Sequence, residues 1–257
     1  MGFLDKLLKP TPFYNTYQAY KRKKAERIQE RLEAEYHPKR VAFYRQLLAP
    51  GDVVFDVGAN VGNRVQAFLE TGARVIAVEP QPACVAVLRQ KFAEKITIEP
   101  VGLAGEPGEL EMHLSTDSTI STFSTDYIEN TKDRFKYSDW TGSIKVPITT
   151  MDALIARHGV PKFCKIDVEG FELEVLKGLN QPLPCLSMEY CVPEIKEPMV
   201  ACVERLHELA PEGRFNYSIG ESMQWALRDW KTFEEFRRHI DTPEFTATSF
   251  GDIYFKS

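Results

Sequence analysis

The sequence lacks any apolar run long enough to cross a bilayer, and it does not open with the pattern of a signal peptide. Its five cysteines are odd in number and include no Cys-x-x-Cys pair, so nothing indicates a disulfide framework or a zinc site. We therefore expect a protein that has no membrane span and works in a reducing cytoplasm.

Positive charge is also scarce, because 32 Lys and Arg stand against 37 Asp and Glu and give a net charge of -5. A nucleic-acid binder usually needs a basic surface. The one basic run, Lys21–Lys24, is followed by residues of both signs, which is typical of the solvated face of a helix. We expect a small-molecule partner and no nucleic acid, and the sequence leaves the oligomeric state open.

The 257 residues, 43% of them hydrophobic, are enough for one large domain over 1–257. Residues 1–50 are predicted to form a helical extension, with helices over 16–35 and 39–48. In the core, 51–257, short apolar strands alternate with helices, which predicts an α/β fold with a mostly parallel central sheet and helices on both faces. Residues 115–143 show no period, so we expect a long loop that covers a binding site.

The strongest local motif is Asp56-Val57-Gly58-Ala59-Asn60-Val61-Gly62, which lies between a predicted strand and a predicted helix. Gly58 and Gly62 let the backbone approach a ligand without a Cβ in the way, and the helix start offers free N–H groups. A dinucleotide site has Gly-x-Gly-x-x-Gly, whereas Asn60 and Asn63 hold the second and third glycine positions here. This pattern disfavours a dinucleotide, and the lack of a following Gly-Lys-Ser/Thr excludes a Walker loop.

Glu79 ends the next predicted strand, 17 residues after Gly62, and Pro80 follows it. An acidic side chain at that place can accept hydrogen bonds from both hydroxyls of a ribose. We therefore predict a nucleoside site formed by Gly58, Asn60, Gly62, Glu79 and Pro80.

The second motif is Lys165-Ile166-Asp167-Val168-Glu169-Gly170-Phe171-Glu172-Leu173-Glu174-Val175-Leu176-Lys177-Gly178. Together with the motif over 56–62, it resembles the FkbM-type methyltransferase family, over about residues 50–190 and again at 251–255. The resemblance implies a Rossmann-like class I methyltransferase fold, S-adenosyl-L-methionine as cofactor, and methylation of a hydroxyl oxygen on a sugar, a polyketide or a related small molecule. The carboxylate of Asp56 would also suit the positive sulfonium of that cofactor.

Three acidic residues are candidates for the chemistry, because ligands of open α/β sheets lie beyond the carboxyl ends of the strands. Asp167 closes one predicted strand, Glu189 lies in the next, and Glu169 is in the turn after Asp167. Carboxylates held close together need a shared proton or a cation. One of them could take the proton of the acceptor, or they could hold a divalent ion such as Mg²⁺ that acidifies the hydroxyl.

A third possibility is that Asp167 only orients the cofactor while Glu169 caps the following helix. For Glu172 and Glu174 we expect positions on the solvated face of that helix. Two other functions remain open. One is an NAD(P)-dependent oxidoreductase, and the other is a non-catalytic nucleoside-binding or scaffold protein on the same fold.

Overall fold

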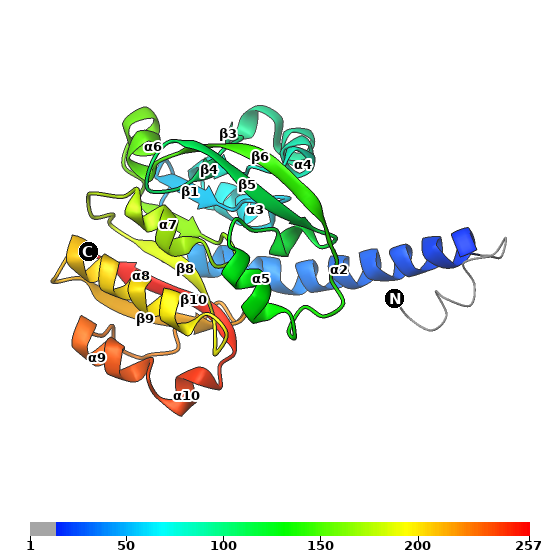
Figure 1. Ribbon diagram of the computed structural model, residues 1–257. Helices are drawn as coiled ribbons and strands as arrows, with labels where there is room; N and C mark the ends of the chain where they lie inside the picture. The colour runs from blue at the N-terminus through cyan, green and yellow to red at the C-terminus, as the bar shows by residue number, and fades with distance from the viewer. Residues whose placement is uncertain (1–13) are drawn as a thin grey trace.

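The computed structural model describes residues 14–257, so the first part of the extension expected over 1–50 lies outside the described residues. The chain begins with a long helix, α2 (Tyr14–Tyr44), and continues into an α/β body (Figure 1). We expected two helices before the body, separated near Pro38. That prediction was wrong, because α2 continues through Pro38, and its last turn buries Val41, Phe43 and Tyr44 against the body.

The body is organised around a seven-stranded sheet with the order β3-β2-β1-β7-β8-β10-β9. Its strands are β1 (Val53–Val57), β2 (Arg74–Val78), β3 (Thr97–Glu99), β7 (Phe163–Ile166), β8 (Leu186–Cys191), β9 (Arg214–Ile219) and β10 (Phe250–Lys256). All neighbours are parallel except β10, which runs antiparallel to both β8 and β9. The predicted mostly parallel sheet is confirmed. The direction in which successive strands are added to the sheet reverses between β1 and β7, because β2 and β3 lie on one side of β1, and β7 and β8 lie on the other. Sheets of this kind bind ligands at such a reversal.

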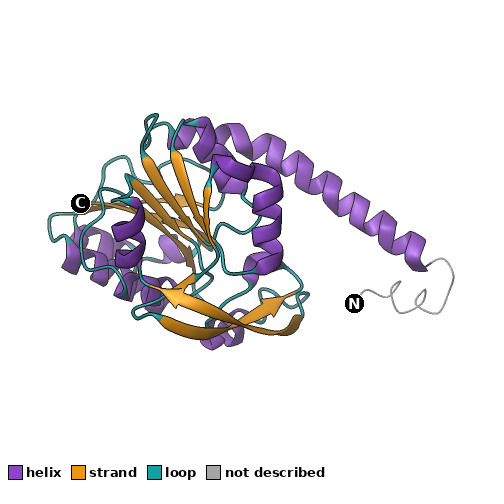
Figure 2. Cartoon of the chain, turned by 90° about the horizontal axis from the view of Figure 1, so that it is seen from above, coloured by secondary structure: helices purple, strands orange, loops and turns teal. Residues whose placement is uncertain are grey.

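Helices cover both faces of this sheet, as expected from strands that are apolar on both sides (Figure 2). On one face, Val54 and Phe163 pack with α2 and with α3 (Asn63–Glu70). On the other face, Phe55 and Cys164 pack against a second core. The remaining helices are α4 (Pro82–Phe92), η1 (Ala93–Lys95), α6 (Met151–His158), α7 (Glu172–Lys177), α8 (Lys196–Leu209), α9 (Phe233–His239) and α10 (Pro243–Thr246).

The segment over 115–143 is not the long loop that we expected. It contains η2 (Ser118–Ile120) and α5 (Thr125–Thr131), and it joins β5 (Gly108–Ser115) to β6 (Trp140–Thr149). With β4 (Gly102–Leu103), these strands form a small sheet of order β4-β6-β5. Side chains of the segment cap these short elements, and Asp117 accepts a hydrogen bond from the backbone N–H of Thr119 at the start of η2. Ser124, for example, accepts a hydrogen bond from the backbone N–H of Tyr127 at the start of α5.

No helix in the described part of the chain is both long enough and apolar enough to cross a membrane.

Candidate active site

The loop after β1 packs tightly against the loop after β7. Gly58 has φ +85°, and a Cβ at this position would lie 1.8 Å from the backbone oxygen of Asp167. Gly62 has φ +86°, and a Cβ there would lie 2.3 Å from the Phe92 ring. Both glycines are therefore required by the protein's own packing and not only by the approach of a ligand.

Glu79 lies at the end of β2 and is held by this same loop. Its Oε2 accepts a hydrogen bond from the backbone N–H of Asn60 at 2.8 Å, and its Oε1 accepts one from that of Gln81 at 2.7 Å. Burial raises the pKa of Glu79, although the two N–H donors favour the charged form. A carboxylate has about four acceptor positions, so two remain for the hydroxyls of a ligand.

A cavity opens in front of Glu79, with about 490 Å³ of empty space when the open solvent at its mouth is included. Four of the six residues predicted to bind the cofactor line it: Gly58, Asn60, Glu79 and Pro80. The other two, Asp56 and Gly62, are not among the residues that line it. The opposite wall is apolar and consists of Val101, Leu103, Met112, Phe123 and Phe171. The cavity therefore combines one acidic hydrogen-bonding group with an apolar surface.

Asp56 points into the interior, where its side chain is 1% exposed and its Oδ2 has no hydrogen-bond partner within the described residues. Burial raises the pKa of Asp56 to about 7. The nearest compensation comes from the strand paired with it, because Asp56 lies opposite Lys165 in β7. Asp56 therefore lies inside the sheet, opposite Lys165, and does not line the cavity.

The ammonium group of Lys165 lies beneath the carboxyl edge of the sheet, with only 2% of the side chain exposed. It donates a hydrogen bond to Oδ2 of Asp167 at 2.5 Å and lies 3.7 Å from Oδ1 of Asp252 in β10. These two carboxylates raise the pKa of Lys165 despite its burial. Lys165 is thus a buried cation that fixes the side chain of Asp167.

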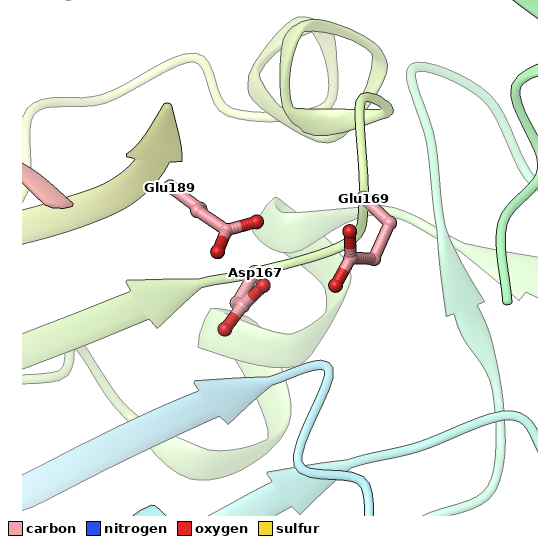
Figure 3. A group of neighbouring side chains, drawn as sticks. All are labelled: Asp167, Glu169 and Glu189. Carbon is pink, nitrogen blue, oxygen red and sulfur yellow. The ribbon is translucent and has the colours of Figure 1, made fainter. Parts of the chain in front are cut away.

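Asp167, Glu169 and Glu189 come together at the carboxyl ends of β7 and β8. One side-chain oxygen of each lies within 4.8 Å of those of the other two. Figure 3 shows the three carboxylates turned toward a common space. Burial and the charge of Asp167 raise the pKa of both Glu169 and Glu189 well above the ordinary range. Such a group can share a proton or accept one from a substrate.

The position of Glu169 is fixed by the segment around α5. The hydroxyl of Tyr127 donates a hydrogen bond to Oε2 of Glu169, and the hydroxyl of Thr122 donates to its backbone oxygen at 2.7 Å. Glu169 has φ +55°, a left-handed conformation that costs energy for a residue with a Cβ. The backbone therefore turns its carboxylate toward Asp167, while α5 holds it there.

Glu172 differs from the sequence prediction. We expected it on the solvated face of α7, but it is 5% exposed, and its Oε1 accepts hydrogen bonds from the N–H groups of Val168 at 3.0 Å and Gly170 at 3.3 Å. It thus shapes the turn that carries Glu169. Glu174 is partly exposed and pairs with Lys177, as a surface residue does.

A second and larger cavity, with about 1180 Å³ of empty space when the open solvent at its mouth is included, also borders this turn. Its walls include Arg40, Arg64, Tyr127, Arg134, Phe135, Glu189, Glu221 and Phe250. Five residues line both cavities: Gly58, Asn60, Thr119, Asp167 and Glu169. Two of the three acidic residues therefore stand where the cavities meet, and Glu189 faces the larger one.

Several residues of the site were missed in the sequence, Lys165 and Tyr127 above all. Lys165 could have been found as the single charged residue in the apolar strand Phe163-Cys164-Lys165-Ile166, since a fully buried lysine needs a partner. Tyr127 gives no such signal, because its contact with Glu169 joins residues 42 positions apart.

A doubly wound sheet with one antiparallel strand, and a cavity at the reversal of strand order beside an acidic strand end, define the Rossmann-like class I methyltransferase fold. Residues 56–236 match the family model described as the methyltransferase FkbM domain. The chain belongs to this family, which confirms the resemblance seen in the sequence.

The chain is similar to two curated proteins. It is 31% identical over 149 residues to a hexuronic acid methyltransferase of Haloferax volcanii, and the match covers 56% of each chain. It is 31% identical over 159 residues to the 31-O-demethyl-FK506 methyltransferase of Streptomyces tacrolimicus, and the match covers 52% of this chain and 61% of the relative. The chain thus matches less than two thirds of the length of either relative.

Among solved structures, a TehB-like SAM-dependent methyltransferase from Corynebacterium glutamicum aligns over 93% of this chain and 99% of its own, with 11% identity and a TM-score of 0.47.

Proposed function

We propose that the protein transfers the methyl group of S-adenosyl-L-methionine to a hydroxyl oxygen of a small molecule. The observation that carries the proposal is the meeting of two cavities at Asp167 and Glu169. One cavity has the acidic strand end that suits a ribose, and the other is large enough for an acceptor. Methyl transfer to oxygen needs the acceptor and the donor on opposite sides of the moving group, held in line.

The residues of the smaller cavity fit the nucleoside part of this cofactor. Glu79 keeps free acceptor positions, its carboxylate is fixed by two backbone donors, and the wall with Val101, Leu103 and Phe123 can cover a planar base. The cofactor supplies a methyl group on a positively charged sulfur. The nearby carboxylates of Asp167 and Glu169 favour that charge in the bound state.

In the proposed reaction, the acceptor oxygen forms a bond to the methyl carbon, the bond from that carbon to sulfur breaks, and the hydroxyl proton passes to a carboxylate. Glu169 and Glu189 are placed to receive it, because their raised pKa values make them effective bases once ionised. Asp167, to which Lys165 donates a hydrogen bond, lies beside them. The role of the protein is then to position the acceptor and to hold its proton.

The three carboxylates are also a possible site for Mg²⁺. Two features favour the proton route. The ammonium of Lys165 already occupies Oδ2 of Asp167, and the Tyr127 hydroxyl occupies Oε2 of Glu169. A divalent ion prefers oxygen ligands that are not engaged by other donors. We therefore propose catalysis by a carboxylate base without a bound metal.

The names of the two curated relatives point to hydroxylated small molecules as acceptors, one being a hexuronic acid and the other 31-O-demethyl-FK506. We propose a sugar or a natural product of comparable size for this chain and expect no nucleic-acid substrate.

The test is an assay with isotope-labelled S-adenosyl-L-methionine and a panel of sugars, uronic acids and hydroxylated natural products, analysed by mass spectrometry. We expect label in at least one acceptor, and equal turnover with and without a chelator. Tight binding of the cofactor without turnover on any acceptor would favour a non-catalytic nucleoside-binding protein. Binding of a nicotinamide cofactor instead would overturn the proposal.

A further inference from the structure

Charge is distributed unevenly along the chain. Residues 1–31 contain eight Lys and Arg but only three Asp and Glu, whereas residues 32–257 contain 24 basic and 34 acidic residues. The first 31 residues therefore have a net charge of +5, and the rest has -10. Such an asymmetry between two parts of a chain indicates that the basic part contacts an anionic surface.

The structure separates this basic part from the body. In two views at right angles, the N-terminal portion of α2 extends away from the body with no other element beside it (Figures 1 and 2). Among the described residues, the last turns of the helix are anchored to the body, where Arg40 pairs with Glu221, His37 pairs with Glu70, and Phe43 and Tyr44 are buried. The exposed side chains that are described in the projecting portion are therefore available to a partner.

The projecting portion presents an exposed basic stripe, which we define as Lys23, Lys24, Arg27 and Arg31. All four side chains are exposed. Positions 24, 27 and 31 follow one another at intervals of three and four residues, and position 23 lies beside them, so the four share one face of the helix. Tyr20, 64% exposed, continues the same face four residues before Lys24. The stripe thus combines positive charge with an aromatic ring.

We propose that this stripe binds the anionic surface of a lipid bilayer. A lipid surface fits better than a nucleic acid because apolar residues accompany the cations. Tyr20 lies beside the stripe on the same face of the helix, and the sequence before α2 contains Phe3, Leu4, Leu7 and Leu8 among Lys6 and Lys9. Aromatic and aliphatic side chains enter the boundary between headgroups and acyl chains, while Lys and Arg contact the anionic headgroups.

This binding mode is peripheral and agrees with the observation that no described helix could span a membrane. It also explains why the stripe lies on a projecting helix. The acidic body would be repelled by an anionic surface, and a helix that reaches beyond it lets the cations approach first. The proposal concerns a surface outside both cavities, so it stands or falls independently of methyl transfer.

The test is co-sedimentation of the full chain with vesicles of phosphatidylcholine alone or mixed with phosphatidylglycerol, at low and high salt. We expect binding only to the anionic vesicles and release by salt, because the screening length shortens. The triple variant Lys23→Ala, Lys24→Ala, Arg27→Ala should bind about 100-fold more weakly, since each basic residue near the surface contributes appreciably to the attraction.

The matched control removes three exposed cations of the body, with Arg89→Ala, Lys95→Ala and Lys162→Ala. It makes the same change in net charge and should bind like the unaltered chain. Equal loss in both triple variants, equal binding to neutral vesicles, or no vesicle binding by the unaltered chain would overturn the proposal. So would salt-sensitive binding to a mixed-sequence RNA, measured in parallel, that exceeds binding to anionic vesicles.

Discussion

Buried carboxylates occur at two strand ends of this sheet, and they are held in different ways. Glu79, at the end of β2, accepts hydrogen bonds from two backbone N–H groups. Glu169 and Glu189, near the ends of β7 and β8, face Asp167 and each other. Burial raises the pKa in both places, but two N–H donors favour the charged form of Glu79, whereas the neighbouring Asp167 raises the pKa of Glu169 and Glu189 further.

The difference indicates separate roles for the two places, ligand binding at Glu79 and proton transfer at Glu169 and Glu189. A carboxylate fixed by the backbone suits the binding of a neutral polar ligand, because it changes neither charge nor position. A carboxylate that resists ionisation suits a reaction in which a proton must be accepted. Under the proposed function, the same residue type at equivalent ends of one sheet would serve binding at one place and chemistry at the other. Four groups of substitutions can test this comparison.

The largest effect is expected in the acidic cluster. Asp167→Asn, Glu169→Gln and Glu189→Gln replace a carboxyl group by an amide with little change in shape, and at least one should lower kcat by about 10²–10⁴-fold, the usual contribution of a general base. Cofactor affinity should change little in Glu189→Gln, because Glu189 does not line the smaller cavity. Glu174→Gln on the surface of α7 is the control. Near-normal turnover in all three variants would contradict a role for these carboxylates in proton transfer.

Lys165→Met should have the next largest effect. It leaves Asp167 and Asp252 without their buried cation, and breaking a buried pair costs about 3–5 kcal/mol of stability. The double variant Lys165→Met, Asp252→Asn removes one of the stranded charges and should recover much of the melting temperature. If Lys165 fixes Asp167 for the reaction, kcat stays low in the double variant while the affinity for S-adenosylhomocysteine is normal. Full recovery of kcat would indicate that Lys165 stabilises the fold and does not position Asp167 for the reaction.

Glu79→Ala should act on binding. Loss of hydrogen bonds to a charged group costs about 1.5–3 kcal/mol, so calorimetry should show cofactor affinity about 10- to 100-fold weaker. The exposed residue Glu94, changed to Ala, serves as the control. Unchanged affinity in Glu79→Ala would contradict the proposed role of Glu79 in cofactor binding. A fall in kcat at saturating cofactor would instead show that Glu79 takes part in chemistry.

Asp56→Asn should have the smallest effect, on the pH dependence of stability. The folded-state pKa of about 7 lies above the ordinary value of 3.8, so the folded chain binds the extra proton and stability falls as the pH rises through this interval. The asparagine variant does not ionise there. It should melt at a higher temperature than the unaltered chain at pH 8, by an amount equivalent to about 1–3 kcal/mol, and the advantage should vanish near pH 4. An equal difference at both pH values would contradict this origin.

Much of the site follows from the sequence because parallel strands bring their carboxyl ends to one edge. Asp167, Glu169 and Glu189 were each recognised as acidic residues at or near a strand end, and the topology places them together. Glu172 could not be placed in the same way. It is the first residue of α7. The periodicity of hydrophobic residues does not show whether such a residue faces solvent or, as here, accepts hydrogen bonds from the preceding loop.

Where the sequence did not predict the structure, contacts between distant residues outweigh the local sequence pattern. In the segment over 115–143, short elements such as α5, of seven residues, hold their place through contacts with distant residues, as Tyr127 does with Glu169. Local pattern is weak in elements of this length. At Pro38 the opposite holds, since a strong local breaker is tolerated inside a long helix whose end is anchored by Phe43 and Tyr44.

The antiparallel strand β10 has a consequence for how the protein reaches its active form. Residues 250–256 enter between β8 and β9, two strands that are not paired with each other, and they bring Asp252 beneath Lys165. Until this insertion occurs, β8 is an open edge, and the buried ammonium lacks one of its counter-ions. Such a long-range pairing is slow to form, so the acidic cluster should be assembled late in folding. A nascent chain would thus lack the proposed proton acceptor until its sheet is closed.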